Sequence, residues 1–297
     1  SRVDVSCEED LFEEIARMYG YGNIPSTLPY LLASDTPLNE EMHVRRILQD
    51  RLCSLGFLEA VNLSFMSEKQ LKDLDISTDG LLKLMNPMSA EQAVLRPDLA
   101  PSLLQNLLHN QNHGVEGAKI FEYSRTFHFG DMAAPCVEEE TLVMGLYGKM
   151  QKSDWRGAGD SEMDFYYMKG AVEALLEGLG FAGLKLDRNS LPPFLHPGRS
   201  ARVLDGDTPL GWLGELNPVH QEKLGFRERP VLAEFSVQEL IPRIRTERRV
   251  REIPRLPAIE RDLAILVDRS VPALDVEQTI RKQAGDLLEE PFLFDLY

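Results

Sequence analysis

Four acidic side chains near the start of the chain have the types and spacing of a cation site. Asp10, Glu13 and Glu14 stand at positions i, i+3 and i+4 of a predicted helix, so their carboxylates share one face, and Asp4 lies just upstream. These like charges repel one another, and an oxygen-ligating cation such as Mg²⁺ or Ca²⁺ would relieve the repulsion. The alternative is a capped, solvated acidic helix, and the spacing alone favours it.

The start of this helix has a capping signal of its own. Ser6 followed three residues later by Glu9 predicts a capping box. Acidic residues in a first turn also face the positive end of the helix dipole. Residues 23–37 are rich in Pro and Ser and predict a linker after the helix.

The sequence contains none of the common catalytic motifs. Neither GxxxxGK[ST] nor GxGxxG occurs, and GxSxG and HExxH are also absent. The six histidines are scattered; His43 and His109 lie on predicted helices, and His113 at a helix end predicts a cap rather than a ligand. Three widely separated cysteines predict reduced thiols in a cytoplasmic protein rather than disulfides or a metal site.

The overall composition limits the classes of partner. A hydrophobic fraction of 43% is ordinary for a soluble protein, and no apolar run approaches the length of a membrane span. The net charge of −16 argues against a surface broadly attractive to nucleic acid, so any such contact must be local. The chain opens in a structured segment and stops at the apolar run PFLFDLY, so we expect an excised part of a longer protein.

Hydrophobic periodicity predicts the elements that must position any site. Residues 39–55 have a helical stripe of apolar residues, residues 58–66 alternate like a strand, and residues 81–85 predict another strand. Further along we expect helices at 98–114 and 164–181, strands at 118–130 and 140–150, a hairpin around Asp205-Gly206-Asp207, and a strand at 231–241. Strands joined by hairpins with helices among them predict an α+β domain on a mostly antiparallel sheet.

The composition changes abruptly near Pro242. Residues 243–261 contain seven arginines and two prolines, which predicts a domain boundary and the one region where local positive charge could meet phosphate; a basic linker that pairs with acidic neighbours is equally compatible. Beyond it, a strand, a helix and a strand predict a β-α-β unit that begins a second domain.

Five stretches, in order, resemble the β subunit of bacterial phenylalanyl-tRNA synthetase. They are DLFEEIARMYGYGNIP, NPMSAEQAVLRPDLAPSLLQNL, KIFEYSRTF, HPGRSARV with GWLGELNPVHQEKLGF, and RDLAILVD with FDLY. The resemblance covers essentially the whole chain and implies four parts. These are the end of a B5 domain with a linker (1–35), a catalytic-like class II synthetase module, B6–B7 (36–243), a basic linker (244–254), and the first half of a ferredoxin-like anticodon-binding B8 domain (255–297).

The residues of the synthetase-like module nevertheless depart from a working active site. The family of class II enzymes holds ATP phosphates with a motif 2 Arg near Arg-x-Glu and a motif 3 Arg in a Gly-rich segment. KIFEYSRTF lacks the Arg-x-Glu, and FRERPVLAEFSVQEL lacks both the Gly-x-Gly and the Arg entering a helix. Without such an Arg, adenylate formation loses its main electrostatic stabilisation. We therefore expect no catalytic residues and no bound cofactor within the module, and no aminoacylation by this chain alone.

The resemblance implies partners and a metal. A catalytic α subunit binds ATP and pairs with the module through helix 39–55 in an (αβ)₂ heterotetramer, which makes phenylalanyl-tRNA from phenylalanine, ATP and tRNA(Phe). The apolar stripe of that helix is otherwise simply core-facing. A Mg²⁺ shared with the α subunit is implied at Asp4, Asp10, Glu13 and Glu14, which match the family's acidic pattern. We expect this site to be weak without the α subunit.

Two other interpretations remain open. A stand-alone nucleotide- or acyl-binding enzyme of the biotin-ligase type would need convergent cations on the sheet, for which Arg96 and Arg125 are the candidates. A protein-interaction module without a role in translation would leave the five ordered stretches unexplained. HPGRSARV, with His196, Arg199 and Arg202, either contacts a partner or tRNA or simply forms a turn into a hairpin.

Overall fold

The structure is a computed structural model. It describes residues 4–28, 40–130, 135–150, 161–245, 257–289 and 291–296. The chain divides into two compact units, Ser1–Arg248 and Arg249–Tyr297. Within the described residues, no helix is long and apolar enough to cross a bilayer.

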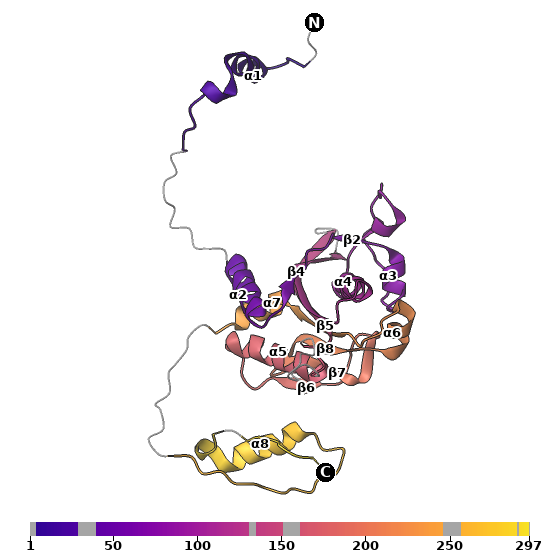
Figure 1. Ribbon diagram of the computed structural model, residues 1–297, viewed down its shortest axis with the longest axis vertical. Helices are drawn as coiled ribbons and strands as arrows, with labels where there is room; N and C mark the ends of the chain where they lie inside the picture. Colours follow the sequence, from indigo (N-terminus) through magenta and orange to yellow (C-terminus); the bar gives the residue numbers. More distant parts are fainter. Residues whose placement is uncertain are drawn as a thin grey trace. The chain divides into compact units, whose positions relative to one another are not determined.

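A seven-stranded sheet forms the centre of the first unit, with the strand order β1-β4-β5-β9-β8-β7-β6 (Figure 1). Only β1 and β4 run parallel, and all other neighbours are antiparallel. The strands are β1 (Leu58–Glu59), β4 (Gly117–Phe129), β5 (Cys136–Gly148), β6 (Lys185–Asp187), β7 (Leu195–Asp205), β8 (Thr208–Leu216) and β9 (Val231–Ser236). The long strands and the hairpin at Gly206 match the expectations for these segments.

Both faces of the sheet are covered, because the central strands alternate apolar residues toward two cores. Leu142 and Met144 of β5 belong to a core that includes residues of α2, α5 and α7, whereas Val143 and Tyr147 belong to a core that includes α4. The helices of the described residues are α1 (Glu8–Tyr19), α2 (Glu40–Ser54), α3 (Glu68–Lys72), α4 (Ala100–Asn112), α5 (Phe165–Gly178), α6 (Pro218–Leu224), α7 (Val237–Leu240) and α8 (Ala273–Ala284). Short 3₁₀ turns are η1 (Tyr21–Asn23), η2 (Ala90–Gln92), η3 (Ile241–Arg243) and η4 (Gly285–Leu287).

The stripe of α2 faces the core, as its periodicity predicts. Val44, Leu48 and Leu52 are buried, and Ile47 and Leu55 pack against them. Met42 is the stripe's one strongly exposed member, with 68% of its surface accessible. The helix therefore buries most of its apolar face inside the fold.

Two predicted strands of the first unit are wrong, and a third, 231–241, is wrong in its second half, where Val237–Leu240 form α7. Residues 58–66 form no continuous strand: β1 joins the large sheet, and β2 (Phe65–Met66) pairs with β3 (Val94–Leu95) in a separate small sheet. Between them the backbone N–H of Asn62 donates to the side chain of Glu122 at 3.3 Å rather than to a strand carbonyl, and its side chain donates to Asn106 and Glu122. Residues 81–85 make only an isolated bridge between Lys83 and Val94.

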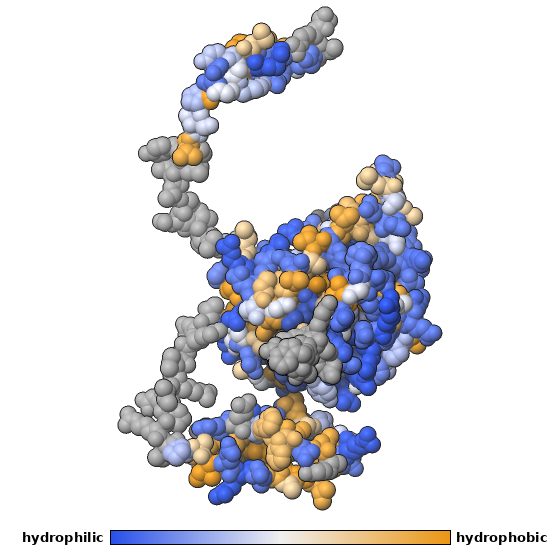
Figure 2. Space-filling view, viewed as in Figure 1, coloured by the Kyte–Doolittle hydropathy of each residue, from blue (hydrophilic) through white to orange (hydrophobic). Residues whose placement is uncertain are grey.

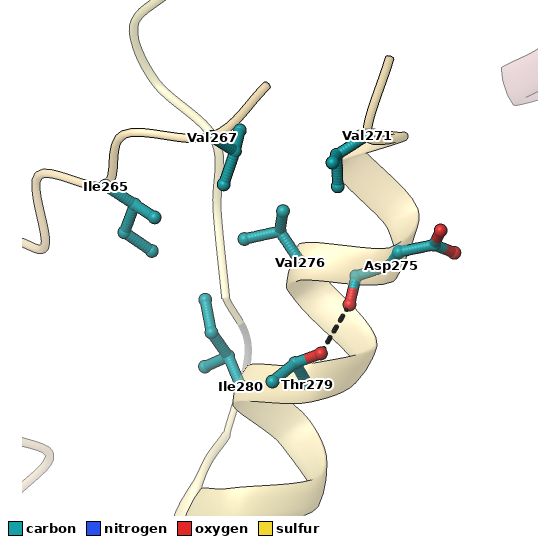
Figure 3. A pocket seen from close by; sticks show the side chains of 7 residues that line it. All are labelled: Ile265, Val267, Val271, Asp275, Val276, Thr279 and Ile280. Carbon is teal, nitrogen blue, oxygen red and sulfur yellow. Dashed lines mark hydrogen bonds between the residues drawn. The ribbon is translucent and has the colours of Figure 1, made fainter. Parts of the chain in front are cut away.

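The second unit contains α8 between two extended segments. The helix is confirmed, but the described residues of the flanking segments are not assigned as strands, and none of the described residues of this unit is buried. In a split β-α-β unit the two strands are not adjacent in the sheet. The backbone N–H and C=O groups of one strand therefore cannot hydrogen-bond to those of the other. An apolar groove of about 320 Å³ remains open against α8, where Ile265, Val267, Val276 and Ile280 point toward one another (Figure 3).

Candidate functional site

Among the acidic residues of α1, Asp10 caps the start of the helix and Glu13 is exposed to solvent. The carboxylate of Asp10 accepts the backbone N–H groups of Ser6 at 2.7 Å and Cys7 at 3.0 Å, both through Oδ2. These bonds, the one from Ser6 first, lower the pKa of Asp10 to about 2. The predicted capping box of Ser6 and Glu9 is therefore wrong: the helix starts one residue later, with Cys7 as N-cap, so the acid at its third position is Asp10.

The other three candidate metal ligands lie near this cap but do not form a complete metal-binding site with it. Glu13 is exposed, Glu14 pairs with Arg17 at 2.5 Å, and Asp4 precedes the helix. The described part of the chain brings no group of three or more His, Cys, Asp or Glu side chains into metal-binding range. The four carboxylates thus present at most part of a coordination shell.

The opposite side of α1 is apolar and exposed. Leu11, Phe12, Ile15, Met18 and Tyr19 have accessible fractions between 53% and 79%. Their spacing follows one helical face, and no residue of α1 is buried. A face of this kind is a surface for contact with other protein.

The first candidate cation, Arg96, forms its hydrogen bonds with other groups of the chain. Arg96 is completely buried; its Nη1 donates to Glu122 Oε1 at 2.8 Å, its Nη2 donates to the hydroxyl of Ser124, and its Nε donates to the carbonyl of Arg125 at 3.1 Å. Glu122 also accepts from Asn62 Nδ2 at 2.7 Å. These three bonds and the complete burial of its side chain hold Arg96 inside the fold rather than open to a ligand.

The second candidate cation is at the surface. The side chain of Arg125 is 57% exposed and pairs with Glu138 at 2.7 Å and more loosely with Glu140 at 3.9 Å. Arg96 and Arg125 thus do not converge on an open pocket. The interpretation as a stand-alone nucleotide- or acyl-binding enzyme is not favoured.

A pair of carboxyl groups joins β9 to the residues just before α4. Glu234 of β9 lies beside Asp98, Trp212 and the backbone of Leu99, and Asp98 accepts the N–H of Ala100 at 2.7 Å. Among the described residues, Oε2 of Glu234 is buried without a hydrogen-bond partner. Burial raises the pKa of Asp98, and burial together with the charge of Asp98 raises the pKa of Glu234 well above its usual range. Two acids at this position would repel a phosphate.

Sequence reasoning missed both polar clusters. The signal for Glu234 was available, because a single acid interrupts the apolar run VLAEF at a position that faces the core. The partners of Arg96 could not be found in this way, because Glu122 and Ser124 are separated from it by 26 and 28 residues of sequence. Only the pairing of strands brings them together.

The remaining candidates have partners within the chain. His196 Nδ1 accepts the N–H of Gly198 at 3.0 Å, Arg199 pairs with Glu215 at 2.9 Å, and Arg202 donates to the carbonyl of Ser190 at 2.8 Å. These three candidates lie within β7, whose pairing with β8 shifts register between Leu195 and Ser200, so this stretch forms an irregular strand rather than a turn before one. Of the arginine cluster, residues 246–256 lie outside the described residues; Arg243 pairs with Glu239 at 2.9 Å.

The sheet topology and the polar residues described above define the class of protein. It has a class II aminoacyl-tRNA synthetase fold, and its candidate phosphate-binding residues, Arg96 and Arg125, are paired with glutamates of the chain. Two solved structures share the fold. They are pyrrolysyl-tRNA synthetase from Desulfitobacterium hafniense, with a TM-score of 0.52 and 18% identity over 68% of each chain, and PylSc of the same organism, with a TM-score of 0.51 and 16% identity over 67% of each chain.

The sequence comparisons identify the particular family. Residues 24–237 match the phenylalanyl tRNA synthetase beta chain CLM domain, and residues 254–297 match the ferredoxin-fold anticodon binding domain. The chain therefore belongs to the phenylalanyl-tRNA synthetase beta chain family, which confirms the resemblance seen in its sequence.

Curated relatives agree with this assignment. Phenylalanine–tRNA ligase beta subunits of Carboxydothermus hydrogenoformans and Psychrobacter arcticus are 34% and 35% identical over 300 and 298 residues. Each alignment covers all of this chain but only 37% and 36% of the relative. The chain thus spans little more than a third of the length of these relatives.

Proposed function

We propose that this chain is a non-catalytic portion of the β subunit of phenylalanine–tRNA ligase. It serves as a scaffold and interface for the catalytic α subunit and contributes to binding tRNA(Phe). The whole enzyme, an (αβ)₂ heterotetramer in the cytoplasm, makes phenylalanyl-tRNA from phenylalanine, ATP and tRNA. The observation that carries the proposal is the burial of Arg96 against Glu122 on a synthetase-type sheet, where its guanidinium is bonded by the chain itself.

We assign four parts to the chain: 1–35, the end of a B5 domain and a linker; 36–243, the catalytic-like module; 244–254, a basic linker; and 255–297, the first half of the anticodon-binding domain. The α subunit binds the ATP. The matches to the two family domains, residues 24–237 and 254–297, support this division.

The surface for the α subunit lies beside α2 rather than on its stripe. Because the stripe is buried, the apolar groups available nearby belong to the edge of the sheet, where Leu58, Val61 and Leu63 are 71%, 88% and 61% exposed. Val61 and Leu63 alternate with the half-buried Asn62 in the segment that follows the edge strand β1. Such an exposed apolar edge supports docking of another subunit.

Mg²⁺ at the acidic helix remains part of the proposal. Asp4, Asp10, Glu13 and Glu14 would hold it jointly with the α subunit, with waters completing the shell. The contacts of Asp10 use only Oδ2 and leave Oδ1 outside the cap, which fits a group with one oxygen for the helix and one for a cation. When bound, the ion would neutralise the acidic face against the partner.

A binding titration against purified α subunit, with and without Mg²⁺, tests the proposal. Glu13→Gln with Glu14→Gln removes two ligands and keeps the Asp10 cap, and Glu8→Gln with Glu9→Gln on the same helix is the matched control. We expect Mg²⁺ to strengthen binding of the wild type and the control but not of the first variant. Equal binding under all conditions would remove the metal site, and no binding would overturn the role in assembly.

A further inference from the structure

A pair of histidines closes the last turn of α4, away from the polar clusters described above. His109 lies in the last turn and His113 is the C-cap residue, so the two stand at positions i and i+4. Both are exposed, and their ring centres are 4.1 Å apart with an angle of 33° between the planes. The rings therefore lie side by side on one face of the helix end.

The hydrogen bond of His113 determines which of its nitrogens is available. Nδ1 of His113 lies 2.8 Å from the carbonyl oxygen of His109. A carbonyl oxygen only accepts, so Nδ1 carries the proton of the neutral ring and Nε2 keeps its lone pair. A backbone carbonyl that receives the second ring N–H is the usual support of a metal-ligating histidine, because it orients the ring and increases the basicity of the ligating nitrogen.

The surrounding helix end favours a cation. The carbonyl groups of a last turn form the negative end of the helix dipole. Residues 109–112 are His, Asn, Gln and Asn, so no lysine or arginine of this turn competes for the position. The backbone N–H of His113 bonds to the carbonyls of His109 and Asn110, both at 3.1 Å, which holds the turn before any ligand binds.

We propose that His109 and His113 form a two-histidine site for a divalent transition metal such as Zn²⁺, Ni²⁺ or Cu²⁺, with waters as the remaining ligands. Two imidazoles bound to one ion at about 2.0–2.1 Å with a right angle between the bonds have ring centres roughly 4.5 Å apart. The observed separation of 4.1 Å is within a small side-chain adjustment of that value. Imidazole nitrogens select these ions over Mg²⁺ and Ca²⁺, which prefer oxygen.

Binding would link the end of α4 to the turn that leads into β4. Gly114 follows with a positive φ of 80°, and the carbonyl of Val115 accepts the hydroxyl of Tyr147 at 2.9 Å. The turn is thus already attached to the sheet, and a metal bridge across His109 and His113 would hold it from the helix side as well. This site does not depend on the proposed role in the ligase.

The test is Cu²⁺ binding by calorimetry and electron paramagnetic resonance on the whole chain. His109→Gln and His113→Gln each remove one ligand, and His43→Gln on α2 is the matched control because His43 is also an exposed helical histidine. We expect one Cu²⁺ with two nitrogen ligands in the wild type and the control, and at least tenfold weaker binding in either variant. Zn²⁺ should compete and millimolar Mg²⁺ should not.

Two results would overturn the site. One is Cu²⁺ binding of unchanged affinity and stoichiometry in His109→Gln, a variant that leaves the cap of His113 intact. The other is displacement of Cu²⁺ by Mg²⁺ at equal concentration, which would place the ion on carboxylates elsewhere.

Discussion

Replacing Glu234 by glutamine should make the chain more stable at pH 8 and change little at pH 5. The pKa values of Asp98 and Glu234 are both raised by burial, and that of Glu234 also by the charge of Asp98. With a raised pKa, the folded state keeps its proton to higher pH than the unfolded chain. The pair therefore favours folding most below the unfolded carboxyl pKa of about 4, and this contribution is lost as pH rises through the folded pKa.

A glutamine at 234 removes the second acid while keeping a polar group for the same neighbours. Its amide can donate to Asp98 and accept from Trp212, so the bonds to both residues can be kept. Relieving a buried, imperfectly satisfied carboxyl is worth on the order of 1–3 kcal/mol. In a unit of this size that corresponds to a rise in melting temperature of roughly 2–10 °C.

The assay is thermal and urea unfolding of wild type and Glu234→Gln at pH 5 and pH 8. Glu222→Gln on α6, an exposed position, is the control for loss of one surface charge. The expected result is a gain that is large at pH 8 and small at pH 5 for Glu234→Gln alone. An equal loss of stability at both pH values would refute the reasoning, because it would mean that Glu234 acts through packing rather than through a shared proton.

Three further predictions concern the sheet and the first helix. Arg96→Met should cost about 3–5 kcal/mol in urea unfolding because it leaves a buried charge unpaired, and adding Glu122→Gln should recover much of that; no recovery would argue against an electrostatic origin. Gly211→Ala places a Cβ 1.9 Å from a backbone carbonyl of the next strand and should lower the free energy of unfolding by about 3 kcal/mol or more. Gly170 is exposed on a helix with open space around it, so Gly170→Ala should raise the free energy of unfolding by about 0.5–1 kcal/mol in the same measurement. The carboxyl of Asp10 should titrate near pH 2 by NMR, and its cap should persist until pH falls through that value; a midpoint near 4 would mean the cap does not form in solution.

The central strands and main helices could be predicted because the hydrophobic pattern of each element reflects which of its own residues are buried. β4 and β5 contain long apolar runs that contribute to both cores, and α2, α4 and α5 each bury one apolar face, so sequence pattern and burial agree. Residues 58–66 alternate like a strand, but the N–H and the side chain of Asn62 donate to Glu122, 60 residues away, where the chain passes from one sheet to the other. A pattern of hydrophobicity contains no information about such a partner.

The acidic helix shows a different limit. Spacing correctly indicated that Asp10, Glu13 and Glu14 lie on one helix, but it did not indicate that Asp10 also forms the cap. The cap uses one oxygen of this carboxylate, and whether the other binds a cation depends on groups supplied from elsewhere. The second unit has the same limit, because α8 is evident from its sequence while the strands beside it need neighbours that the pattern does not specify.

The two polar clusters on the sheet explain why a synthetase fold need not carry synthetase chemistry. An active site holds polar groups that are left partly unsatisfied until a substrate arrives, which is why it can stabilise charge that develops during reaction. Here Arg96 is satisfied by Glu122 and Ser124, and Glu234 is engaged by Asp98 and Trp212, so much of the polar capacity of this face is used within the fold. A phosphate site on this face would need donors that are not already bonded within the fold.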